Sequence, residues 1–350
     1  IGISTLLAAV GWVAANDVLA LNKAEHSAII TLPEDIFTDK EVTVETDEGT
    51  ETKTIQVVDL DYVADQLKSN GIIEFKLVFR LFSVFSNADE KMAPGTYQLD
   101  TDMDYRAIVT NLGSNSASRQ MVTVTIPEGY TVDQIFQRLE ENGVSTVEKL
   151  QDMAATHDYA FSFLQEIPLG NYHRLEGYLF PDTYEFYMGE DPKTVINKML
   201  VNFDRRFTDE MRAEVQENGY SVRDIVIIAS MIERETDGSD RATIASVIYN
   251  RLNNPNSGTQ GYLQIDATLV YALGRVITQA DYTADTPYNT YTNQGLPPGP
   301  ISNPGLASIQ AAMDPENTSY YYYALGSDGT HSFFRTLEEQ QNFIAQQRSN

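Results

Sequence analysis

Residues 221–237, SVRDIVIIASMIERETD, are the stretch that decides how the rest of the chain is organised. Ser221, followed three residues later by Asp224, matches the pattern with which side chains cap the start of a helix. The residues after this cap are apolar on most of the helical circumference, which is typical of a helix at the centre of a domain. The stretch therefore predicts a buried central helix.

One acidic residue falls on the buried side of this predicted helix. Glu233 shares a helical stripe with three apolar positions, Val222, Val226 and Ala229. A carboxylate buried away from cations favours its neutral form, which is the form that a general acid needs. Glu233 is therefore predicted to be the catalytic residue. The alternative is a structural glutamate of the last turn, paired with Arg234 or Arg241.

The second acidic residue of the motif, Glu235, is expected to face another direction. At about 100° per residue, it lies about 200° round the helix from Glu233. Glu235 is therefore predicted to be a solvated or capping charge and not part of a buried site.

The composition indicates a folded protein that does not bind nucleic acid. The 350 residues are enough for two or three domains, and 42% of them are hydrophobic. Fifty acidic against 24 basic residues give a formal net charge of −26, which repels nucleic acid and anionic lipid head groups. Because there is no cysteine and the four histidines are dispersed, no disulfide, metal site or cofactor is predicted.

The N-terminal residues 1–21 are predicted to be a truncated membrane anchor. Residues 1–15 are apolar, although about 20 apolar residues are needed to span a bilayer. Trp12, near the end of this run, resembles an interfacial aromatic side chain. With this anchor, we expect a single-pass protein of the cell membrane whose remaining chain lies outside the cytoplasm. A buried helix and the core of a signal peptide are the alternatives.

Residues 27–120 are predicted to form a small α+β module. Short strand patterns alternate with helical patterns, and the pair Asn70–Gly71 closes one of the helices. A similar strand-then-helix unit, closed by Asn142–Gly143, follows this module. The module has about the size of a carbohydrate-binding domain.

The segment HRLEGYLFPDTYEF, residues 173–186, places aromatic rings beside carboxylates. Alternation of the rings with polar neighbours favours a cleft wall, on which flat rings stack against sugar faces. Glu176 or Asp182 would then accept hydrogen bonds from sugar hydroxyls. The alternative for Asp182 is an ordinary loop carboxylate after a proline.

Two polar residues precede another predicted helix. Gln264 lies on a stretch that is expected to be extended, and it is predicted to bind substrate because no structural role explains it. Asp266 is well placed as the N-cap of a helix that runs to Leu273 and is stopped by Gly274, so capping alone explains it. The loop of residues 286–305 is rich in proline and glycine, and long ordered loops tend to be functional.

Five motifs form a signature: LEGYLFPDTY (175–184), ASMIERET (229–236), YLQIDAT (262–268), YNTYTNQGLPPGPISNPG (288–305) and HSFFRT (331–336). Together they resemble the YceG-like (MltG) family of endolytic murein transglycosylases. The resemblance implies an α+β protein. A LysM-like module, residues 27–120, would follow a membrane-spanning helix, and residues 121–350 would form a mixed α/β catalytic domain with a buried catalytic helix.

By this resemblance, Glu233 corresponds to the family's catalytic glutamate, the first Glu of its SIVEKET-like motif. The family's cleft residues correspond to six further positions, which are predicted to bind substrate: Glu176, Asp182, Gln264, Asp266, Asn289 and Tyr291. Two positions depart from the family pattern. Ala267 stands where the family usually has Pro, and Phe334 stands where it often has Asn, so the local loop shapes are expected to differ.

The resemblance implies cleavage of the β-1,4 bond between N-acetylmuramic acid and N-acetylglucosamine in nascent peptidoglycan, leaving 1,6-anhydro-muramoyl ends. One carboxylate, Glu233, suffices if the C6 hydroxyl of the sugar is the nucleophile. Peptidoglycan synthases, the penicillin-binding proteins, are the implied protein partners. Two alternatives stay open. One is a hydrolytic muramidase using Asp266 or Asp182 as a second carboxylate, and the other is a non-catalytic wall-binding scaffold of the division or elongation machinery.

Overall fold

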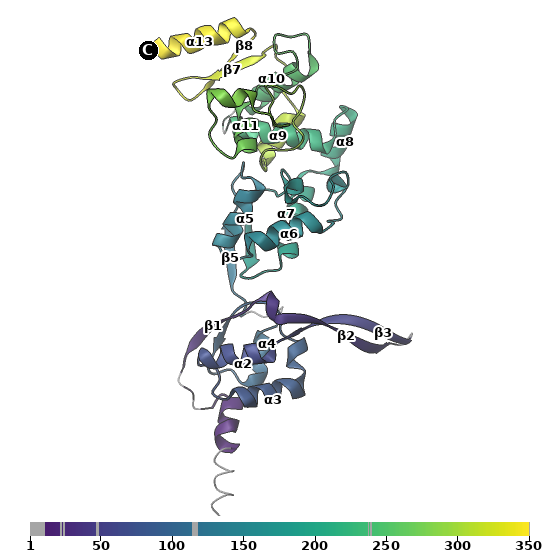
Figure 1. The fold of residues 1–350 in the computed structure, drawn as a ribbon, viewed down its shortest axis with the longest axis vertical. Helices are drawn as coiled ribbons and strands as arrows, with labels where there is room; N and C mark the ends of the chain where they lie inside the picture. Colours follow the sequence, from purple (N-terminus) through teal and green to yellow (C-terminus); the bar gives the residue numbers. More distant parts are fainter. Residues whose placement is uncertain are drawn as a thin grey trace, which may run out of the picture. The chain divides into compact units, whose positions relative to one another are not determined.

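The computed structural model describes residues 11–21, 23, 25–46, 49–113, 118–236, 238 and 240–349. Helices and small two-stranded sheets make up the described chain, which confirms the predicted α+β class (Figure 1). The chain divides into two compact units, which are described separately. Unit 1 contains Ile1–Val124, Leu139–Ser145 and Glu185–Asp191, and unit 2 contains Thr125–Arg138, Thr146–Tyr184 and Pro192–Asn350.

The first part of the chain alternates strands and helices, as the sequence predicts. Its elements are β1 (Ser27–Leu32), β2 (Phe37–Thr46), β3 (Gly49–Val58), α2 (Leu60–Ser69), α3 (Lys76–Ser86), β4 (Gly95–Asp100), α4 (Tyr105–Asn111) and β5 (Met121–Thr125). Helix α2 ends at Asn70, and the following Gly71 has a φ of 75°, which favours glycine. The Asn-Gly stop is therefore confirmed here.

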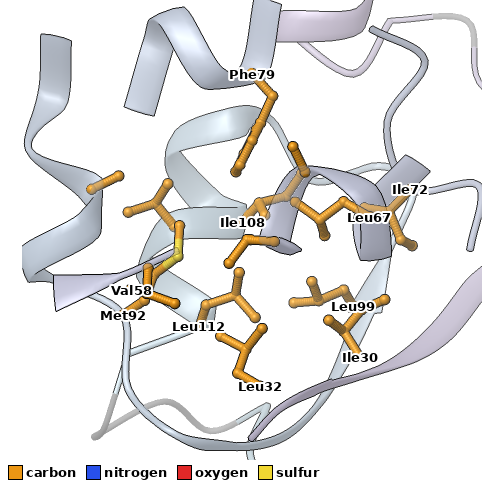
Figure 2. Packing of buried hydrophobic residues seen from close by; sticks show 14 of the residues in the cluster. Ile30, Leu32, Val58, Leu67, Ile72, Phe79, Met92, Leu99, Ile108 and Leu112 are labelled. Atoms are coloured by element: carbon orange, nitrogen blue, oxygen red, sulfur yellow. The ribbon is translucent and has the colours of Figure 1, made fainter. Parts of the chain in front are cut away.

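The core of unit 1 lies between the β1–β4 sheet and its helices. Strand β1 pairs antiparallel with β4, with Ser27 opposite Asp100 and Leu32 opposite Gly95. Apolar side chains from both strands and from α2, α3 and α4 pack together (Figure 2): Ile30, Leu32, Leu99, Leu67, Phe79 and Ile108. Among the residues that the structure describes, strands β2 and β3 pair with each other alone, and they extend away from the helices (Figure 1). Whether this unit is LysM-like stays a prediction, as do the predicted domain limits.

Part of the predicted membrane anchor is described. Residues 11–18 are helical, whereas residues 1–10 lie outside the described residues. Within the described ranges, no helix has the length and apolar composition needed to cross a membrane.

The second part of the chain is mainly helical. Its elements are α5 (Val132–Glu141), α6 (Val147–Thr156), β6 (Thr183–Tyr187), α7 (Pro192–Arg206), α8 (Asp209–Glu217), α9 (Val222–Glu235), α10 (Arg241–Asn253), α11 (Asp266–Leu273), α12 (Leu306–Met313), β7 (Tyr322–Leu325), β8 (His331–Phe334) and α13 (Leu337–Ser349). Strand β5 pairs with β6, and β7 pairs antiparallel with β8.

Helix α9 is the centre of unit 2, as predicted from its sequence. The Ser221 hydroxyl accepts a hydrogen bond from the amide of Asp224, and the Asp224 carboxylate accepts one from the amide of Ser221, so the capping box is present. Every residue from Ile225 to Ile232 is buried. The helix packs against α8, α10, α11 and α12, which together cover its apolar circumference.

The predicted cleft wall of residues 173–186 is wrong. Tyr178, Phe180 and Tyr184 are buried, and Tyr178 stacks on Phe163 with ring centroids 5.3 Å apart. These rings fill the core of unit 2. The alternation with polar residues arises because part of the segment continues into the strand β6, in which alternate side chains point inward.

Candidate active site

Glu233, the predicted catalytic residue, lies at the C-terminal end of α9 with a side chain that is 6% exposed. Its carboxylate accepts a hydrogen bond from the amide of Gly305 at 2.9 Å. The Arg241 guanidinium lies 3.9 Å from the other oxygen. The expected burial of Glu233 is therefore confirmed, whereas the expected absence of a cation beside it is wrong.

A second carboxylate lies beside Glu233. The Glu128 carboxylate packs against Gly305, since a Cβ atom added to this glycine would come within 1.9 Å of it. Gly305 is also the residue whose amide donates a hydrogen bond to Glu233. Burial raises the pKa of Glu128, and the charge of Glu233 adds to this effect. Glu128 was missed by sequence reasoning because it is far from α9 in the chain, in the loop before α5.

Glu235, at the end of the same helix, is partly buried, so the prediction of a solvated charge is wrong. Burial raises its pKa, and this effect exceeds the lowering by the hydrogen bond that the Tyr323 hydroxyl donates at 2.8 Å. The negative charge of Asp266 raises the pKa further. Burial is the largest effect, so the pKa of Glu235 is raised on balance, although the positive charges of His331 and Arg251 lower it.

The surroundings of Glu235 are built by the C-terminal hairpin and α10. Arg251 is buried and donates to the carbonyl oxygens of Tyr321, at 2.7 Å, and Leu263. Its guanidinium lies 5.7 Å from the ring centre of Tyr323, so it supports the residue that binds Glu235. Arg251 forms these carbonyl hydrogen bonds and does not donate to the Glu235 carboxylate.

Asp266 does not cap α11. It is the first residue of the helix, and Ile265 occupies the N-cap position, so the predicted N-cap role is wrong. Instead, its two carboxylate oxygens accept hydrogen bonds from Tyr291 at 2.5 Å and from Tyr282 at 3.4 Å. Gly274 ends the helix with a φ of 63°, which confirms the predicted stop.

Gln264 and Asn289 hold the backbone around Asp266. Gln264 is not extended as predicted, because its φ is 52°, a left-handed value that costs energy for a residue with a side chain. Asn289 is buried and donates to the carbonyl of Ala284 at 2.8 Å, while its side-chain oxygen accepts from the amide of Tyr291 at 3.0 Å. Asn289 therefore fixes the loop that brings Tyr291 to Asp266.

Glu176 makes structural contacts. Its carboxylate is 2% exposed and accepts hydrogen bonds from the Val132 amide, the Asn303 side chain and the Tyr271 hydroxyl, at 3.1, 3.0 and 3.1 Å. Burial raises its pKa. A carboxylate this enclosed can shape a site, but it is not open to a sugar.

Asp182 also makes structural contacts. It accepts hydrogen bonds from Asn202 at 3.0 Å and from Arg206 at 3.2 Å, and these partners hold its pKa below the usual value despite partial burial. Its surroundings therefore agree with the alternative of a structural loop carboxylate. Of the seven predicted site residues, the structure brings together Asp266, Asn289, Tyr291 and Gln264.

A cavity of about 740 Å³ opens beside α11 and the start of α5. Its lining includes both charged and aromatic side chains: Asp133, His173, Arg234, Tyr271, Arg275 and Tyr288. Arg234 stands between the two glutamates in the sequence, and neither carboxylate lines the cavity. Among the described residues, no group of three or more histidine, aspartate or glutamate side chains is arranged to hold a metal ion.

The chain is similar to known proteins over most of its length. The YceG-like family model matches residues 56–346. A Bacillus subtilis protein named endolytic murein transglycosylase is 33% identical over 293 residues, which cover 79% of this chain and 79% of that protein. A Streptococcus pneumoniae protein of the same name is 29% identical over 344 residues, which cover 90% of this chain and 60% of that longer protein.

One solved structure supports the fold. The crystal structure of a YceG-like protein from Listeria monocytogenes matches this chain with a TM-score of 0.55 and 27% sequence identity. The match covers 90% of this chain and 98% of the Listeria chain. The similarity therefore extends through both compact units.

Proposed function

Because the chain belongs to the YceG-like family, we propose that it is an endolytic murein transglycosylase, a lyase that acts on peptidoglycan. It would cleave the β-1,4 bond between N-acetylmuramic acid and N-acetylglucosamine within glycan strands and leave 1,6-anhydro-muramoyl ends. The names of the relatives support the substrate and the type of reaction. The residues that perform it are proposed from the geometry of unit 2.

Glu235 is the general acid in this proposal, and its desolvated position beside Asp266 is the observation that carries it. A carboxyl group with a raised pKa holds its proton to a higher pH than an ordinary carboxyl group, and it can give this proton to a leaving oxygen. Glu233, the residue predicted from the sequence, is the competing candidate. Its contacts with the Gly305 amide and with Arg241 match the alternative of a structural glutamate in the last turn of the helix.

The reaction needs one proton donor and no water. Glu235 gives its proton to the oxygen of the leaving N-acetylglucosamine as the bond to C1 of the muramic sugar breaks. The C6 hydroxyl of the same sugar then attacks C1, and the Glu235 carboxylate takes the hydroxyl proton. The attack is intramolecular, so proximity lowers its barrier.

Asp266 supports this reaction through its charge. Both of its oxygens accept hydrogen bonds from tyrosine hydroxyls. This arrangement suits a fixed negative charge that stabilises the positive charge developing on the sugar. It suits a base that takes a proton from water less well. This favours transglycosylation over the muramidase alternative. Gln264, Asn289 and Tyr291 would shape the surroundings of Asp266, and Glu176 and Asp182 would support them from within the fold.

Digestion of purified peptidoglycan is expected to yield muramic ends that are each lighter by one water than the ends made by a muramidase. The C6 oxygen replaces water as the acceptor, so no new reducing sugar forms. Mass spectrometry of the fragments, with a hydrolytic muramidase digest as the reference, checks this result. New reducing ends would show that water is the acceptor, and unchanged strands would favour the wall-binding scaffold.

The pH profile of cleavage is expected to shift in opposite directions in two variants. Activity should fall as pH rises through the pKa of Glu235, because only the protonated acid can donate. Asp266 raises this pKa and Tyr323 lowers it. Asp266→Asn should therefore move the basic limb of kcat/KM to lower pH, and Tyr323→Phe should move it to higher pH. Superimposable profiles for both variants and the parent would contradict the assignment of Glu235.

The proposal has three further parts. They are membrane attachment through the N-terminal residues, an extracytoplasmic catalytic unit and association with penicillin-binding proteins. The relatives named for action on murein support a location outside the cytoplasm, because peptidoglycan is found there. The apolar sequence of residues 1–15 supports the attachment.

A further inference from the structure

Helix α3 of unit 1 exposes a row of large apolar side chains. The exposed fractions are 67% for Leu77, 52% for Leu81, 62% for Val84 and 87% for Phe85. These residues are spaced by four, three and one positions, so they share one face of the helix. We call this set the outer face of α3. An exposed face of this kind marks a surface that meets a partner.

The opposite side of the same helix belongs to the core. Phe79 and Ser83 are buried, and Phe79 packs in the hydrophobic cluster of unit 1 (Figure 2). The helix is therefore apolar on both sides, although the fold covers only one. Packing within unit 1 does not explain why the outer face is apolar.

The N-terminal helix is fixed to the start of α3. Asp17 is buried, and its carboxylate accepts hydrogen bonds from the amides of Glu74 at 2.9 Å and Phe75 at 2.8 Å. The Tyr105 hydroxyl donates to the same carboxylate at 2.5 Å, and the Lys23 ammonium lies 2.8 Å from it. The position of residues 11–18 is therefore tied to that of α3.

The tied helix carries exposed apolar side chains of its own. Trp12 is 67% exposed and Val13 is 43% exposed, and both belong to the apolar run of residues 1–15. Tryptophan is enriched where protein meets the interface of a bilayer. Because Asp17 joins this helix to the residues just before α3, a membrane that receives the apolar run lies close to the start of α3.

We propose that the outer face of α3, together with Trp12 and Val13, lies in the interfacial layer of a phospholipid bilayer. Helices with one face in the protein and one in the acyl boundary bind membranes in this way. This contact would hold unit 1 on the membrane surface. It goes beyond the proposed enzymatic activity and does not depend on it.

The charges of the region specify which lipids suit this face. Lys76 and Arg80 flank the apolar row, but they pair with Asp65 and Asp61, the latter at 2.7 Å. With its basic residues engaged and a chain charge of −26, α3 has little to offer an anionic lipid. The contact is therefore apolar, and it should form on zwitterionic phosphatidylcholine and persist at high salt.

A tryptophan placed on the outer face reports its surroundings directly. Trp12 is the sole tryptophan of the chain, so Trp12→Phe combined with Phe85→Trp leaves one reporter on α3. The full-length variant is reconstituted into phosphatidylcholine vesicles with and without brominated acyl chains. We expect a blue shift in vesicles and loss of most of the emission when the lipid is brominated.

The matched control places the reporter on another element of the same unit. Ile29, on β1, is 57% exposed, and Trp12→Phe combined with Ile29→Trp should keep its emission in brominated vesicles. Equal emission of the Phe85→Trp reporter in both vesicle types would overturn the proposal. A blue shift without lipid that grows with protein concentration would also overturn it, because a second copy would then cover the face.

Discussion

Glu235→Gln is expected to lower the rate of glycan cleavage by a factor on the order of 10² to 10⁴, the contribution typical of a positioned general acid. The amide has nearly the shape of the carboxyl group but cannot transfer the proton. Because the Tyr323 hydroxyl can still donate to the amide oxygen, the fold around α9 should be retained. The rate of anhydro-end formation, measured by mass spectrometry with purified protein, checks the prediction.

Glu233→Gln is the matched control, since it changes the same chemical group on the same helix two residues away. We expect a smaller loss of activity, because the amide oxygen can still accept the hydrogen bond of Gly305. If Glu233→Gln abolishes cleavage while Glu235→Gln leaves it near the parental rate, the sequence-based assignment of Glu233 is right and ours is wrong. Far-UV circular dichroism of both variants separates loss of chemistry from loss of fold.

The features that could be predicted from the sequence are those set by neighbouring residues. The capping box of Ser221 and Asp224 is a contact between residues three apart, and the stop at Gly274 depends on one backbone conformation. The buried character of α9 follows from its unbroken apolar run. Each of these features depends on residues that are close together in the sequence, so the order of the helices in unit 2 could be predicted.

The roles of the acidic residues could not be predicted in the same way, because distant segments decide them. Glu235 was assigned to solvent from its angle on the helix, yet that side is covered by Tyr323, 88 residues away. Helical geometry gives the direction of a side chain but not what lies there. Likewise, Asp266 occupies a position that suits a cap, and only the fold shows that Tyr291 and Tyr282 bind it instead.

Glu176→Ala is expected to destabilise unit 2 by about 2–5 kcal/mol, because each buried donor that loses its acceptor costs about 1–3 kcal/mol. The Glu176 carboxylate joins three segments that are distant in sequence, through the Val132 amide at the start of α5, the Asn303 side chain and Tyr271. Alanine would take this acceptor from the Val132 amide and the Tyr271 hydroxyl, while the Asn303 side chain would keep only its hydrogen bond to the Tyr130 carbonyl. Urea denaturation at constant pH measures the loss of unfolding free energy.

The location of the destabilisation in Glu176→Ala should be measurable as well as its magnitude. Amide hydrogen exchange is expected to accelerate first at the start of α5, because the Val132 amide loses its acceptor. Asp182→Ala is the control: it removes a carboxylate that is 35% exposed and paired with Arg206, and such pairs contribute about 1 kcal/mol or less. Equal losses in the two variants would mean that burial does not set the importance of these carboxylates. A Glu176→Ala protein as stable as the parent would show instead that Asn303 and Tyr271 find other acceptors, and the buried carboxylate would then need an explanation outside stability.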